Sequence, residues 1–161
     1  MNLDQEYLQE LNTPLSVQQF SLFEKLYNDD STNKQLQFNY AWALIKSDSK
    51  ELQMKGVRFL STIFKSSPDK RKECLYFMSL GNYKLKNYEL ALKYLDALIL
   101  AEQEIGNKDL NKLDELKLRI HDDIKRTTGN ALIGIGIGVS VMAVGISLVN
   151  KFWGNNNSHR G

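Results

Sequence analysis

The sequence predicts an all-α protein in which a bundle of six helices is followed by one long apolar segment. Apolar residues recur at intervals of three and four from residue 16 to residue 126, as they do on the buried stripe of an amphipathic helix. The 161 residues include only two prolines, so long stretches are free to be helical. A similar residue pattern also returns after 35 residues, which indicates that helix pairs are repeated.

Clusters of turn-forming residues divide this region into its elements. Asn28-Asp29-Asp30 and Ser66-Ser67-Pro68 interrupt the apolar pattern in the way that helix connections do. The six predicted helices span residues 16–28, 32–46, 50–65, 69–85, 88–104 and 108–127. Together they form a predicted cytosolic domain over residues 16–127.

Residues 1–15 are predicted to be a separate N-terminal arm. They are acidic, yet Leu3, Tyr7, Leu8 and Leu11 would gather on one side of a short helix. An isolated helix this short is marginal in water. Two interpretations follow. The arm is a disordered tail, or its apolar side docks on a groove of the same chain and competes with a partner, which would make it autoinhibitory.

Residues 131–149, from Ala131 to Val149, carry no charge and no proline. Nineteen residues of helix extend roughly 28 Å, close to the hydrocarbon thickness of a bilayer. Lys151 and the aromatic residues after it are typical interface anchors. The segment is therefore predicted to be a transmembrane helix, with a buried core helix as the alternative. Gly134 and Gly138 have the spacing of a membrane-helix contact, which predicts possible self-association.

The two ends of the chain indicate a location. The first 30 residues lack the positive start and apolar core of a secretory signal and the arginines of a mitochondrial presequence. A single span near the C-terminus, with a tail at 150–161, then predicts a single-pass tail anchor with the N-terminus in the cytosol. Moderate hydrophobicity with basic flanks favours the mitochondrial or peroxisomal membrane over that of the endoplasmic reticulum.

Charge and composition exclude several functions. The net charge of +2 comes from two basic residues after position 150, so the helical region is neutral and a nucleic-acid partner is disfavoured. The chain has one cysteine and two histidines, which leaves little for a disulfide, a metal site or a catalytic triad. Phosphate-binding and zinc-binding motifs are absent from the sequence. The sequence predicts no cofactor and no enzyme activity.

The internal repeat identifies the type of helix pair. Tetratricopeptide units repeat after about 34 residues and place a small residue where the paired helices cross. An ordinary helical bundle with chance similarity is the alternative. The equivalent positions, each 35 residues apart, are Gly56 and Ala91, Leu60 and Leu95, and Ile63 and Leu98.

In such units the first helix of each pair lines a concave face, which predicts a groove for a short partner peptide. The alternative is that several of these residues fill the core instead. The predicted groove residues are Phe38, Ala41, Ile45, Glu73, Tyr76, Leu80, Tyr83 and Lys84.

Residues 50–72 carry seven basic and two acidic side chains. A concentration of positive charge of this kind is compatible with an anionic lipid surface or an acidic partner. A solvated helix face is the simpler interpretation.

Three segments, 38–46, 71–76 and 81–85, resemble the mitochondrial fission 1 protein family in its fungal branch. The resemblance extends over residues 16–150. It implies an outer-membrane receptor for the division machinery, which recruits a dynamin-related GTPase through a WD40-repeat adaptor, and it implies a role at peroxisomes. A tail-anchored docking site for chaperones or targeting peptides is the alternative function.

Overall fold

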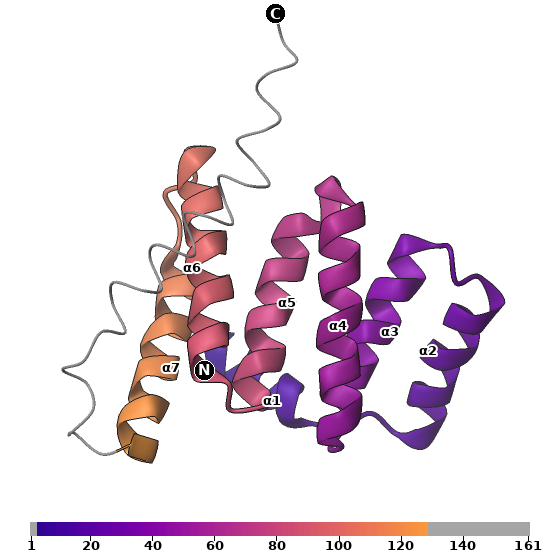
Figure 1. Ribbon diagram of the computed structural model, residues 1–161. Coiled ribbons are helices and arrows are strands. Elements are labelled where there is room, and N and C mark those ends of the chain that lie inside the picture. The colour runs from indigo at the N-terminus through magenta and orange to yellow at the C-terminus, as the bar shows by residue number, and fades with distance from the viewer. Residues whose placement is uncertain (1–2, 129–161) are drawn as a thin grey trace, which may run out of the picture. The chain divides into compact units, whose positions relative to one another are not determined.

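The computed structural model describes residues 3–128, and this part of the chain is helical throughout (Figure 1). The six helices predicted between residues 16 and 127 are all present, and the arm adds one more. The bounds are α1 Leu3–Asn12, α2 Val17–Asp29, α3 Lys34–Lys46, α4 Lys50–Ser66, α5 Arg71–Lys84, α6 Tyr88–Glu104 and α7 Asn111–Thr128.

Side chains just before the helices fix where three of them begin. Ser16 precedes α2 and accepts a hydrogen bond from the backbone N–H of Gln19, whose side chain bonds back to the Ser16 N–H. The side chains of Asn33 and Ser49 likewise accept hydrogen bonds from backbone N–H groups in the first turns of α3 and α4. Each cap satisfies backbone donors that have no partner within the helix. The turn residues between the apolar stripes therefore set the helix ends.

The predicted helix over 69–85 begins differently. A single 3₁₀ turn, Pro68–Lys70, comes first, and α5 starts at Arg71. Proline has no N–H to donate, and the Lys70 N–H bonds instead to the Ser67 carbonyl. The chain thus tightens for one turn before it becomes an α-helix.

The chain divides into two compact units with the boundary between Asn87 and Tyr88. In the first unit α4 packs against α3 on one side and α5 on the other, and α2 packs against α3. In the second unit α6 packs against α7, and the Lys117 ammonium lies 2.6 Å from the Asp96 carboxylate.

Two glycines let the central helices of the first unit approach closely. A Cβ atom at Gly56 would lie 2.6 Å from the Ala41 carbonyl oxygen and 2.8 Å from Ile45 Cγ1. At Gly81 it would lie 2.7 Å from Val57 Cγ2. Gly56, the small residue that the repeat pattern singled out in α4, therefore stands where α4 crosses α3, and Gly81 stands where α5 meets α4 and α3.

None of the helices within residues 3–128 is both long enough and apolar enough to cross a bilayer. The predicted anchor, with Ala131, Gly134, Gly138, Val149 and Lys151, lies outside the described residues and stays a prediction.

Candidate functional site

Aromatic side chains connect α3 to α5 on the face that also meets α1. The Phe77 ring is central, with ring centroids 5.1 Å from Phe38 and 4.7 Å from Trp42. Tyr76 lies edge-on to Phe77 at 5.3 Å. We use the name α3–α5 face for these aromatic residues together with the lysines at the C-terminal ends of the two helices. Its members are Phe38, Trp42, Tyr76, Phe77, Tyr83, Lys46 and Lys84.

Phe77 and Trp42 were not among the predicted groove residues. The predicted stripe along α5 passed through Tyr76 and Tyr83. The stripe Glu73, Phe77, Leu80, Lys84 follows the helical spacing equally well and would have identified Phe77.

The predicted groove residues fall into two groups. Phe38, Ala41, Ile45 and Leu80 are buried, whereas Tyr76, Tyr83 and Lys84 are partly exposed and Glu73 is exposed. Ile45 sits where the glycines of α4 and α5 cross α3, so it supports the face from beneath. The Glu73 carboxylate lies 3.1 Å from the ammonium of Lys70 in the 3₁₀ turn before α5. Their roles in partner binding stay predictions.

The arm helix α1 packs against both α3 and α5. Leu11 is fully buried and Leu8 is partly buried. The backbone of Leu3 and Tyr7 belongs to α1, while their side chains lie outside the described set. A short helix of the same chain therefore packs on the α3–α5 face at the end that carries Lys46 and Lys84.

Lys84 ties the end of α1 to this face. Its ammonium donates to the Leu11 carbonyl oxygen at 3.0 Å and to the Lys46 carbonyl oxygen at 2.8 Å. These carbonyls stand at the C-terminal ends of α1 and α3, where backbone oxygens lack helical partners and the helix dipole is negative. One ammonium group thus donates hydrogen bonds to the terminal carbonyls of two helices that are distant in the sequence.

A second lysine contacts the same end of the arm. The buried Lys46 ammonium lies 3.5 Å from Glu10 Oε1 and 5.9 Å from the centre of the Trp42 ring. Lys46 therefore connects the acidic side of α1 to the aromatic part of the α3–α5 face.

Burial dominates the electrostatics here. Desolvation lowers the pKa of Lys84, with the neighbouring Lys46 adding to the effect and Asp48 opposing it. Burial also raises the pKa of the Cys74 thiol to about 12, with Glu73 as a smaller contribution. No group of three or more His, Cys, Asp or Glu within residues 3–128 is placed to hold a metal ion.

An aromatic face on two repeat helices, occupied by a short helix, is the arrangement of a peptide-binding tetratricopeptide scaffold. Two family models match the chain. The Fis1 N-terminal tetratricopeptide repeat matches residues 35–67, and the Fis1 C-terminal tetratricopeptide repeat matches residues 72–127. The chain belongs to the mitochondrial fission 1 family, which is a family of adaptors and not of enzymes.

Curated relatives support the same assignment over most of the chain. It is 38% identical over 144 residues to the mitochondrial fission 1 protein of Debaryomyces hansenii, covering 88% of this chain and 89% of that protein. The protein of the same name from Neurospora crassa is 41% identical over 141 residues, covering 85% and 87%.

Solved structures show the same fold. Yeast Fis1 in complex with an Mdv1 fragment has a TM-score of 0.66 at 35% identity, covering 75% of this chain and 94% of that one. Yeast Fis1 complexed with a fragment of yeast Caf4 has a TM-score of 0.53 at 36% identity, covering 55% and 94%.

Proposed function

We propose that this chain is a membrane receptor of mitochondrial fission that holds a helical segment of a fission adaptor against its α3–α5 face. The observation that carries the proposal is the position of α1. This face already binds a short helix with one buried leucine and two lysine contacts. A partner helix with similar anchors would use the same surface, with the arm as its competitor.

The relatives supply the class of partner. Yeast Fis1 has been crystallised with fragments of Mdv1 and of Caf4, and the chain shares its fold at more than 30% identity. By the family resemblance, the adaptor would carry WD40 repeats and recruit a dynamin-related GTPase. Residues 131–149 would anchor the receptor in the mitochondrial outer membrane, and in the peroxisomal membrane, with the helices in the cytosol.

Substitution of the two partly exposed tyrosines of the face tests the proposal. The full-length protein in lipid nanodiscs would be titrated with the Mdv1 fragment containing the N-terminal extension and coiled coil. Tyr76→Ala with Tyr83→Ala should weaken binding by about tenfold or more, since truncated interface aromatics commonly cost about 2 kcal/mol. The double variant should stay on mitochondria while the organelles become elongated and under-divided.

Leu22→Ala provides the matched control, because Leu22 is a 54% exposed apolar residue on α2, away from the face. Its fragment binding should equal that of the unaltered protein. Unchanged binding in a folded Tyr76/Tyr83 variant would contradict the groove. Loss of mitochondrial targeting in that variant would show that the face acts in localisation instead.

A further inference from the structure

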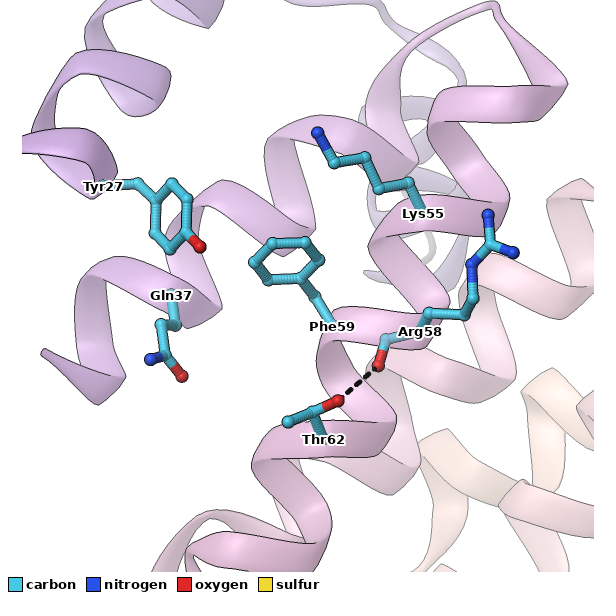
Figure 2. Close-up of a pocket in the computed structure, with 6 residues that line it drawn as sticks. All are labelled: Tyr27, Gln37, Lys55, Arg58, Phe59 and Thr62. Carbon is cyan, nitrogen blue, oxygen red and sulfur yellow. Dashed lines mark hydrogen bonds between the residues drawn. The ribbon is translucent and has the colours of Figure 1, made fainter. Parts of the chain in front are cut away.

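A second hollow lies between α2, α3 and α4 and shares no residue with the α3–α5 face. It is a cleft of 390 Å³ lined by Tyr27, Gln37, Lys55, Arg58, Phe59 and Thr62. Figure 2 shows Tyr27 reaching from α2 toward Phe59 on α4, with Lys55 at one rim and Thr62 at the other. We call this hollow the α2–α4 cleft. A volume of this size accommodates a few side chains of a ligand.

The floor of the α2–α4 cleft is rigid and aromatic. The rings of Tyr27 and Tyr40 stack with centroids 4.9 Å apart, and Phe59 meets Tyr27 edge-on at 5.4 Å and Tyr40 at 5.8 Å. The Tyr40 hydroxyl donates to Glu24 Oε1 at 3.0 Å, which fixes that ring. Tyr27 and Phe59 remain partly exposed, so they offer apolar surface to a ligand.

Hydrogen-bond donors outnumber acceptors around this floor. Gln37 already donates its amide to the Ser31 carbonyl, and Thr62 donates its hydroxyl to the Arg58 carbonyl. Among the described residues, the Tyr27 hydroxyl and the side chains of Lys55 and Arg58 have no hydrogen-bond partner or carboxylate within ion-pair distance. These donors are available to a ligand that accepts hydrogen bonds.

The charge of the rim indicates the same kind of ligand. The Lys55 ammonium is held 5.5 Å from the Tyr40 ring centre and 6.0 Å from that of Phe59, and Arg58 extends from α4 one turn further on. Helix α4 carries four basic residues and one acidic residue. Cations on two sides of an aromatic surface recognise an acidic segment whose neighbouring side chain is apolar.

We propose that the α2–α4 cleft binds an acidic peptide segment in which a Glu or Asp side chain lies next to an aromatic or aliphatic one. One carboxylate would accept from the Lys55 ammonium beside the aromatic floor, a second would accept from the Arg58 guanidinium, which points to the other side (Figure 2), and the apolar side chain would lie on Phe59. A concave site receives an inserted side chain. A flat lipid surface would instead contact all the exposed cations of α4 equally.

A titration of the full-length protein in uncharged phosphatidylcholine nanodiscs tests this site. The probe is a short fluorescent peptide with the core Glu-Phe-Glu-Leu, and its matched control is Gln-Phe-Gln-Leu. The acidic peptide should bind about tenfold more tightly, and added salt should remove the difference. Lys55→Ala with Arg58→Ala should abolish the preference, whereas Lys65→Ala, an exposed lysine on the same helix, should preserve it.

Three results would overturn the proposal. Equal binding of the two peptides would exclude carboxylate recognition, and equal losses in the Lys65 and Lys55 variants would reduce the site to a general basic surface. Stronger Lys55-dependent binding to phosphatidylserine vesicles than to the peptide would assign the cations to a membrane. The Tyr76/Tyr83 variant should bind the acidic peptide normally, so a failure here is distinguishable from a failure of the proposed receptor function.

Discussion

Lys84 is the residue on which the docking of the arm most depends. Its ammonium bonds to both the end of α1 and the end of α3, and no apolar or acidic residue could make those two contacts. Burial disfavours its charge, as the lowered pKa shows, so two carbonyl acceptors are needed to hold it in place.

Replacement of Lys84 by methionine should loosen the arm without unfolding the helices. Methionine preserves the length of the apolar stem, while hydrogen bonds from a charged donor, worth about 1.5–3 kcal/mol each, are lost. We expect limited proteolysis to cut between α1 and α2 several-fold faster. Lys65→Met, on an exposed part of α4, is the control. Equal cleavage rates for all three proteins would mean that Lys84 does not hold the arm.

Cys74 should be chemically inert in the folded protein. It is fully buried, and at pH 8 a thiol whose pKa is about 12 is ionised in only about one molecule in ten thousand. Because it is the only cysteine in the chain, alkylation by iodoacetamide reads this site alone. Mass spectrometry should show no adduct in native buffer and complete reaction in denaturant. Rapid labelling in native buffer would show that α5 opens frequently.

At the scale of the helices, Gly56 and Gly81 differ in the atoms that a Cβ at each position would meet. At Gly56 the nearest obstacle is a backbone carbonyl of α3, which cannot move without the helix. At Gly81 the nearest atoms are the ends of the Val57 and Ile45 side chains. Side chains adjust more readily than a packed backbone, so the two positions should tolerate a methyl group unequally.

Gly56→Ala should therefore lower the free energy of unfolding by about 1–3 kcal/mol, despite the better helix propensity of alanine. Gly81→Ala should change it by about 1 kcal/mol or less. Urea unfolding of both variants measures the difference. Val57→Ala added to Gly81→Ala should recover part of any loss, because it removes the obstructing methyl groups. A larger loss at Gly81 than at Gly56 would contradict these crossings.

Helices and caps were predictable because they depend on local pattern. The stripe from Val57 to Phe64, the serine before α4 and the proline before α5 each mark an element without reference to the rest of the chain. The members of the α3–α5 face were less predictable, because helical spacing allows two stripes along α5 and only one of them contains Phe77. The Lys84 contacts join residues 38 and 73 positions apart, and no local signal reveals them.

At the scale of the whole molecule, the described helices end before the predicted anchor begins. Removal of residues 129–161 should therefore release a folded helical protein from the membrane. Carbonate extraction should find the truncated protein in the supernatant and the full-length protein in the pellet, with equal helical circular dichroism per residue of the 1–128 region. Aggregation or loss of helical signal would show that the removed segment is part of the core.

Deletion of residues 1–14 tests whether the arm competes with the adaptor. In the intact chain the arm is tethered, so its effective concentration at the α3–α5 face is in the millimolar range even if its own affinity is weak. Without it, the Mdv1 fragment should bind several-fold more tightly, and amide exchange in α5 should rise because Leu11 no longer covers that helix. Leu11→Ala with Glu10→Gln should move both quantities in the same direction by a smaller amount, since only one buried side chain and one ion pair are lost. Exchange and affinity that stay unchanged would exclude competition. A lower affinity after deletion would show that the arm is part of the adaptor's binding surface, and the sign of the regulation would be reversed.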